Sequence, residues 1–129
     1  MAAEGHRGDI LYCGQELLKE QHLRSRNGNY TLVMQGDGNF VSYKATTHPA
    51  TPIWHANTTR QGVSAKLLND GRLVVLNAAG AHAWASPAGP LPIDNYRLVM
   101  QNDGNVVLYT SADVPVWSTH SSPKAFGSA

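Results

Sequence analysis

Five side chains with hydrogen-bonding or apolar surfaces recur at the same spacing in two distant parts of the chain. The stretch VMQGDGNFVSY at residues 33–43 returns as VMQNDGNVVLY at residues 99–109, and both contain the pattern Gln-x-Asp-x-Asn-x-Val-x-Tyr. The members of the pattern are, in the first copy, Gln35, Asp37, Asn39, Val41 and Tyr43, and in the second copy, Gln101, Asp103, Asn105, Val107 and Tyr109. Each copy offers two amides, a carboxylate and a phenolic hydroxyl beside a small apolar surface.

A sugar ring fits such a set, because its neighbouring hydroxyls both donate and accept hydrogen bonds and its C–H groups form an apolar patch. Hydrogen bonds to the charged carboxylates of Asp37 and Asp103 should be the strongest, at roughly 1.5–3 kcal/mol net. The alternative is a merely solvated strand face, in which Asp-Gly is present for its turn and Tyr for its β propensity.

A third, altered copy lies between these two. Asp37, Asp70 and Asp103 are each followed by glycine at intervals of 33 residues, which indicates three repeats of about 33 residues. The middle copy keeps the apolar pattern, but its five equivalent positions are Leu68, Asp70, Arg72, Val74 and Leu76. The same turn and core pattern therefore persist without the polar side chains. We interpret the outer copies as two binding sites and the middle copy as a degenerate one.

Each repeat is predicted to form a β-hairpin followed by a third strand. An apolar run such as YTLVMQ leads into an Asp-Gly turn, and a second run such as NFVSY follows it. Trp84 and Trp117 mark the third strand 14 residues beyond their aspartates, whereas Trp54 lies 17 residues beyond its own. The first repeat therefore contains three extra residues, near His48 and Pro49.

The period of two along these strands assigns one face of each sheet to a core. The expected core residues are Leu32, Met34, Phe40, Leu67, Leu73, Val75, Leu98, Met100, Val106 and Leu108. The other face, which carries Val41 with the polar side chains, should be open to solvent. One unit of this size cannot bury its apolar face alone, so we expect an all-β fold of three sheets around a shared axis. The three tryptophans should meet near that axis and supply most of the burial.

The two ends of the repeat region are expected to complete the sheets. The segments GDILYCGQELL and VPVWSTHSS should each add a strand, so residues 15–23 are predicted as strand and turn despite their helical propensity. The whole chain, 1–129, is interpreted as one domain because 129 residues are too few for two ordinary ones.

Charge and composition argue against several classes of function. The net charge is +1 and 15% of residues are charged, with no basic run that would favour nucleic acid. The six histidines lack the spacing of a metal site, so we expect neither an enzyme nor a metal or other cofactor. Cys13 stands alone, which excludes an internal disulfide.

No apolar run reaches the length of a membrane span, so we expect no membrane insertion. The N-terminal stretch MAAEGHRGDILY lacks the apolar core of a secretory signal. From these two features we expect a cytoplasmic or non-classically released protein rather than a secreted one.

The paired motifs, the threefold repeat and the single tryptophan per unit resemble the mannose-binding monocot lectins of the snowdrop-agglutinin type, also called bulb-type lectins. The resemblance covers about residues 9–120. It implies a β-prism II fold, three four-stranded antiparallel sheets around a pseudo-threefold axis, that binds α-linked mannose in glycans or glycoproteins without metal. It also implies that Gln35 contacts the 3-hydroxyl, Asp37 and Asn39 the axial 2-hydroxyl, Tyr43 the 4-hydroxyl and Val41 the ring carbons. The second copy would repeat these roles in the same order.

The chain departs from the plant pattern in ways that affect what the resemblance implies. The disulfide that plant members commonly form between the first two repeats is missing, with Gly38 where one cysteine would stand. This favours a microbial, fungal or animal member kept in reducing surroundings. Family members often dimerise by exchanging the C-terminal strand, and this chain is long enough for such a homodimer. The alternative function is a protein-interaction or antibacterial toxin module on the same fold, with weak or no sugar binding.

Overall fold

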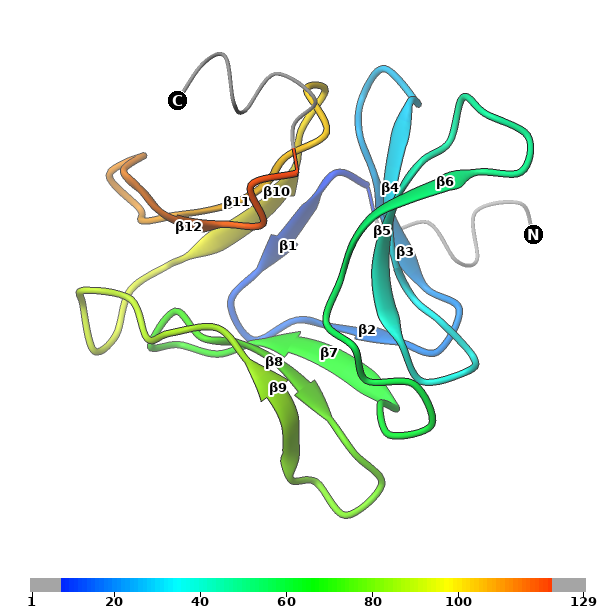
Figure 1. Ribbon diagram of the computed structural model, residues 1–129. Coiled ribbons are helices and arrows are strands. Elements are labelled where there is room, and N and C mark those ends of the chain that lie inside the picture. Colours follow the sequence, from blue (N-terminus) through cyan, green and yellow to red (C-terminus); the bar gives the residue numbers. More distant parts are fainter. Residues whose placement is uncertain (1–7, 122–129) are drawn as a thin grey trace.

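The computed structural model describes residues 8–121 and builds them into three four-stranded antiparallel sheets around a common axis (Figure 1). In spatial order, the first sheet contains β3 (His22–Arg24), β4 (Tyr30–Met34), β5 (Phe40–Lys44) and β6 (Thr51–His55). The second contains β2 (Glu16–Leu18), β7 (Ser64–Leu67), β8 (Leu73–Leu76) and β9 (His82–Ala85). The third contains β1 (Ile10–Tyr12), β10 (Arg97–Met100), β11 (Val106–Tyr109) and β12 (Pro115–Ser118).

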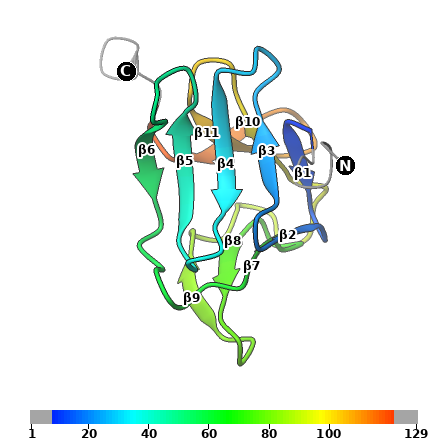
Figure 2. The same ribbon diagram turned by 90° about the vertical axis from the view of Figure 1, so that its right-hand side faces the viewer.

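Each repeat forms one hairpin and a third strand, as predicted. The first sheet, seen face-on in Figure 2, shows the order β6, β5, β4 and β3. This arrangement is the β-prism II fold expected from the sequence. Among residues 8–121, no helix is long and apolar enough to cross a membrane.

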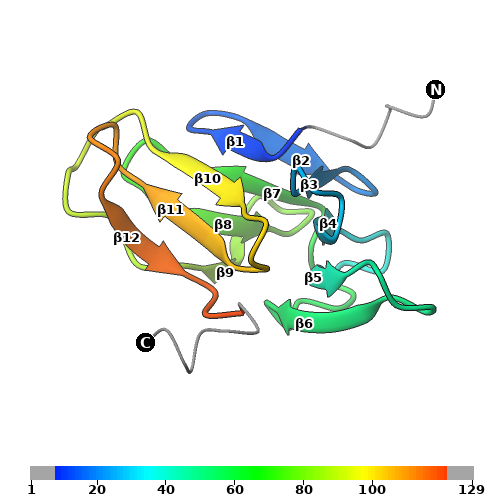
Figure 3. The same cartoon turned by 90° about the horizontal axis from the view of Figure 1, so that it is seen from above.

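The fourth strand of every sheet comes from the segment before the first hairpin. Strands β1, β2 and β3 pair with β10, β7 and β4, and Figure 3 shows them crossing one side of the prism in succession. Each strand has three residues and buries its central leucine, which is Leu11, Leu17 or Leu23. The prediction of strand and turn for residues 15–23 is confirmed. The sharing of this segment among three sheets was not predicted, because three-residue strands are too short to show a period.

The core is the one that strand alternation predicts. All ten expected core residues are buried, with at most 1% of their surface exposed. Tyr96 joins them and is fully buried, and its hydroxyl donates to the Leu91 carbonyl at 2.6 Å while accepting from the Leu91 amide at 2.9 Å. Cys13 packs against the core as a half-buried free thiol.

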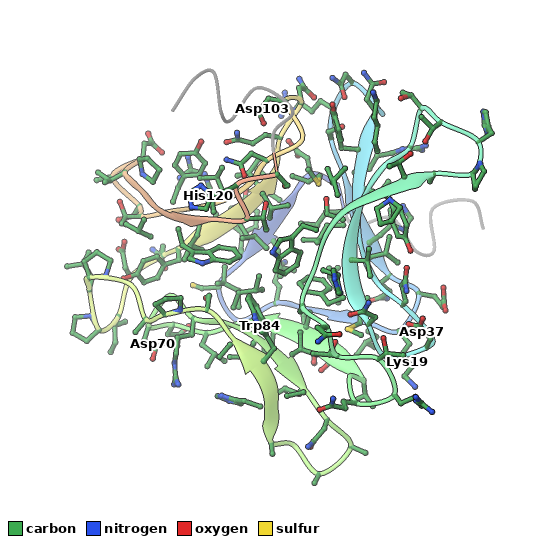
Figure 4. All side chains as sticks on the ribbon, in the orientation of Figure 1. Lys19, Asp37, Asp70, Trp84, Asp103 and His120 are labelled. Atoms are coloured by element: carbon green, nitrogen blue, oxygen red, sulfur yellow. The ribbon has the colours of Figure 1, made fainter. Side chains whose placement is uncertain are left out.

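The three tryptophans converge on the axis, with ring centroids 5.5 Å apart for Trp54 and Trp84, 6.3 Å for Trp54 and Trp117, and 5.8 Å for Trp84 and Trp117. Figure 4 places Trp84 near the centre of the molecule. Their expected role as the main source of burial is wrong, because all three are only partly buried and leucines dominate the fully buried set. The reason is their position on β6, β9 and β12, which are edge strands of their sheets.

The outer face differs from the expected open surface at its valines. Val41 and Val107 are exposed by only 3% and 5%, so the prediction that Val41 is open to solvent is wrong. Val41 lies between Val33 on β4 and His55 on β6, and these larger or equal neighbours flank its small side chain. A bound ring would therefore meet only a narrow strip of valine.

The three extra residues of the first repeat lengthen the β5–β6 hairpin. Ser42 pairs with Trp54 across this hairpin, where Val75 pairs with Trp84 and Leu108 with Trp117 in the shorter ones. A register shift follows the first member of each pair at the same place in all three sheets. The insertion therefore lies beyond Tyr43, as predicted, and leaves the sheet below it unchanged.

Candidate functional site

In the first repeat, the tight turn between β4 and β5 folds the carboxylate of Asp37 back over its own backbone. The Gly38 amide donates to the Gln35 carbonyl at 3.0 Å, and Gly38 has a φ of +94°, which glycine adopts without strain. Oδ1 of Asp37 accepts from the Asn39 amide at 2.9 Å and from Nε2 of Gln35 at 3.0 Å. Asp-Gly is therefore needed for the turn and also fixes the carboxylate.

A directed chain of hydrogen bonds runs from Tyr43 to Asp37. The Tyr43 hydroxyl donates to Oε1 of Gln35, whose Nε2 donates to Asp37. The amide of Gln35 can thus take only one orientation. Oδ2 of Asp37 has no hydrogen-bond partner among residues 8–121 and is available to accept from a ligand hydroxyl.

Asn39 is anchored by the loop that follows β6. Its Oδ1 accepts from the Thr58 amide at 3.0 Å, and the Thr58 hydroxyl donates to the Gly38 carbonyl at 2.7 Å. This leaves Nδ2 of Asn39 directed to the open side, 3.5 Å from Nδ1 of His55. Asn39 can therefore present a donor beside the Asp37 acceptor.

Hydrogen bonding and burial set the charge states of this site. The Asn39 amide and then the Gln35 side chain hold the pKa of Asp37 below its usual value. Burial, with the nearby negative charge of Asp37, raises the pKa of Tyr43. Near neutral pH the site therefore combines a charged acceptor with a protonated phenol that can donate.

The third repeat builds the same cradle from its own residues. Oδ1 of Asp103 accepts from the Asn105 amide at 2.9 Å and from Nε2 of Gln101 at 3.2 Å, and the Tyr109 hydroxyl donates to Oε1 of Gln101. Oδ1 of Asn105 accepts from the Thr119 hydroxyl at 3.2 Å, in the way Asn39 is held in the first repeat. The structure thus brings together the polar members of both predicted sets.

The third-repeat cradle opens into a pocket of about 530 Å³ whose far wall is β12. Its lining combines Gln101, Asn105, Val107 and Tyr109 with Pro115, Val116, Trp117, Ser118 and His120. Sequence reasoning identified the first group and, of the second, treated only Trp117, as a core residue. Their fixed offsets from Trp117 were the available signal, but a turn had to be crossed to bring β12 beside β11.

The middle repeat cannot offer its carboxylate in the same way. Nε of Arg72 lies 2.9 Å from Oδ2 of Asp70, and the Arg72 amide donates to Oδ1 at 3.1 Å, so both carboxylate oxygens are engaged. Leu68 and Leu76 replace the amide and the phenol. An internal ion pair between apolar side chains therefore stands where the outer repeats have a cradle.

The three aspartates lie on different sheets and, in Figure 4, on separate parts of the surface. Asp37 and Asp103 are therefore unable to act together on one glycosidic bond. Within the described part of the chain, no three His, Cys, Asp or Glu side chains gather as metal ligands.

A β-prism II fold with polar cradles on its outer faces defines the class of protein, a carbohydrate-binding lectin rather than an enzyme. The chain is 35% identical over 113 residues to a mannose-specific lectin of Aloe arborescens, which covers 86% of this chain and 95% of the relative. The chain belongs to the family of mannose-binding bulb-type lectins. It spans only 35–36% of the length of some other curated mannose-specific lectins. No family model matches the sequence.

Two solved structures extend the comparison. The snowdrop (Galanthus nivalis) agglutinin in complex with methyl α-D-mannoside is 34% identical with a TM-score of 0.70, over 80% of this chain and 90% of that one. Tarin lectin bound to trimannose is 29% identical with a TM-score of 0.65, over 78% of this chain and 87% of that one. Both confirm the fold predicted from the sequence.

Proposed function

We propose that the chain binds α-mannose and mannose-rich glycans through the cradles of the first and third repeats, and that the middle repeat does not bind. The observation that carries this proposal is the Tyr-to-Gln-to-Asp hydrogen-bond chain, which is built twice and is replaced in the middle by the Arg72–Asp70 ion pair. The mannose specificity of the relatives and the mannoside held by the snowdrop agglutinin support the choice of sugar.

The cradle can recognise two neighbouring hydroxyls at once. In the first repeat, Oδ2 of Asp37 would accept from one hydroxyl while Nδ2 of Asn39 donates to the same or the next one. By resemblance this hydroxyl is the axial one at position 2, which distinguishes mannose from glucose. Few atoms are desolvated at so shallow a site, so affinity for one monosaccharide should be weak, on the order of millimolar.

The test is a calorimetric titration with mannose, glucose and galactose. We expect saturable binding of mannose at two sites per chain and at least about tenfold weaker binding of the other two sugars. Asp37→Asn and Asp103→Asn should each remove one site, because the amide replaces a charged acceptor worth about 1.5–3 kcal/mol. Asp70→Asn is the matched control and should leave two sites. Three sites, or no saturable binding of mannose, would contradict the proposal.

Multivalent binding by a homodimer stays a separate prediction. Strand β12 pairs with β11 of its own chain here. Strand exchange would move β12 and the pocket wall it forms to a second copy. Sedimentation of the purified chain at several concentrations measures this directly, and a single monomeric species throughout would exclude the exchanged dimer.

A further inference from the structure

The two cradles differ in the residue that stands beside the tyrosine on the neighbouring strand. Arg97 on β10 lies directly opposite Tyr109, whereas Thr31 on β4 lies opposite Tyr43. These are equivalent positions, because 66 residues, or two repeats, separate both pairs. The third repeat therefore has a cation against its tyrosine where the first has a short, neutral side chain.

The guanidinium of Arg97 packs on the tyrosine ring and is tied to the turn beyond it. Its Cζ lies 4.9 Å from the centroid of the Tyr109 ring. Nη2 lies 2.7 Å from Oδ1 of Asp113, and Nη1 donates to the Thr110 carbonyl at 3.3 Å. About a quarter of the Arg97 side chain is exposed, so the contact is partly shielded from water.

The turn that holds Arg97 is itself braced from two directions. Within the turn, Oγ1 of Thr110 accepts from the amides of Ala112 and Val114, each at 3.2 Å. From outside, the carboxylate of Asp94 accepts from the Ser111 amide at 2.9 Å and from its hydroxyl at 2.7 Å. Arg97 is thus fixed at its charged end before any ligand binds.

The consequence passes through Tyr109 to the rest of the cradle. A ring held from one side by a fixed guanidinium keeps its hydroxyl on Oε1 of Gln101, and Gln101 in turn holds Asp103. Among the described residues, Tyr43 has no such cation on its ring, so the first cradle orders its tyrosine through the hydrogen bond to Gln35. Pre-ordered groups lose less conformational freedom on binding.

We propose that Arg97 is a positioning residue for Tyr109 and makes the third-repeat cradle the tighter of the two mannose sites. This inference rests on the proposed function. A cation–π contact at a partly exposed position corresponds to about a two- to fivefold difference in dissociation constant. Two sites with the same five-residue pattern would therefore differ in affinity because of a residue outside the pattern.

Both sites can be measured in one molecule by NMR titration with methyl α-D-mannoside. The backbone amides of Asn39 and Asn105 report the first and third sites separately. We expect a lower dissociation constant at Asn105. Arg97→Thr, which copies Thr31, should raise it about two- to fivefold and leave the value at Asn39 unchanged. The first site is an internal control for folding, and Thr31→Val is the matched variant that should change neither value.

A double-mutant cycle separates positioning from a general structural role. If Arg97 acts through Tyr109, then Arg97→Thr should have no further effect on binding in the Tyr109→Phe background, where the hydroxyl is gone. Arg97→Lys, which keeps the charge but not the planar group, should fall between Arg and Thr. Equal affinity at the two native sites, an unchanged ratio in Arg97→Thr, or additive effects in the cycle would overturn the inference. No saturation at either amide would instead refute the proposed function.

Discussion

Ser42 has a buried hydroxyl without a hydrogen-bond partner within residues 8–121. It faces the core from β5, at the position where the other repeats have Val75 and Leu108. Leaving a buried polar group unpaired costs about 1–3 kcal/mol relative to a satisfied one. The first repeat thus has a polar defect directly beneath its cradle.

Replacing this hydroxyl with an apolar group should stabilise the protein. We expect Ser42→Val to raise the free energy of unfolding by about 1 kcal/mol in urea titration, because a methyl group has no hydrogen bond to lose. Thr58→Val removes another buried hydroxyl, but one that donates to the Gly38 carbonyl at 2.7 Å, so it should lower stability by about 1 kcal/mol. If both variants moved stability in the same direction, pairing of the hydroxyl would not be the deciding factor.

The charge of Asp37 predicts the response of the first site to acid. Since the Asn39 amide and Gln35 lower its pKa, the carboxylate remains charged down to its ordinary value of 3.8 and takes up a proton only below it. Mannose binding reported by the Asn39 amide should therefore be constant from pH 7 to pH 4 and be lost only at lower pH. Tryptophan fluorescence checks that the fold persists. A midpoint near pH 5 would show that another group controls binding.

At the scale of elements, the sequence predicts most clearly what the repeat itself determines. The three hairpins follow from an Asp-Gly turn between period-two runs, and the tryptophan spacing located the insertion beyond Tyr43. Non-local pairing was harder to predict. Strands β1–β3 show no period, and the burial of Val41 depends on β4 and β6 neighbours that no local pattern specifies. Arg97 lay outside the repeated motif because its partner Tyr109 is on the adjacent strand.

The shared hairpin predicts that the lost middle site can be rebuilt. The middle turn keeps the geometry of the outer ones, with Gly71 at a φ of +86° and the Arg72 amide on Oδ1 of Asp70. We expect the triple variant Leu68→Gln, Arg72→Asn, Leu76→Tyr to bind three mannose residues per chain by calorimetry, because it restores both amides and the phenol.

A matched variant shows which change matters. Arg72→Asn alone releases the Asp70 carboxylate from its ion pair but supplies neither the Gln nor the Tyr, so it should still bind two sugars. If the triple variant also bound two while remaining folded, the cradle would need residues of the flanking strand β9 as well. If Arg72→Asn alone bound three, the ion pair would be the entire block.

At the scale of the whole molecule, the prism places its two cradles on different outer faces. The first and third sheets meet at the axis through their tryptophans, so their outer faces point away from each other (Figure 1). One sugar residue cannot occupy both cradles. Two branches of a glycan, or two points on a polymer, can do so when the spacing between them permits.

This arrangement predicts a large difference between monosaccharide affinity and retention on a polymer. On a mannan-coated sensor, Asp37→Asn and Asp103→Asn should each dissociate about 10²-fold faster than the native chain, because the second binding event becomes intramolecular only when both sites are present. In solution, each variant should keep its remaining site at roughly millimolar affinity. Asp70→Asn should be retained like the native chain. If the single-site variants were also retained as long as the native chain, the two cradles would not engage one polymer together, and their placement on separate faces would instead favour the joining of two separate glycans.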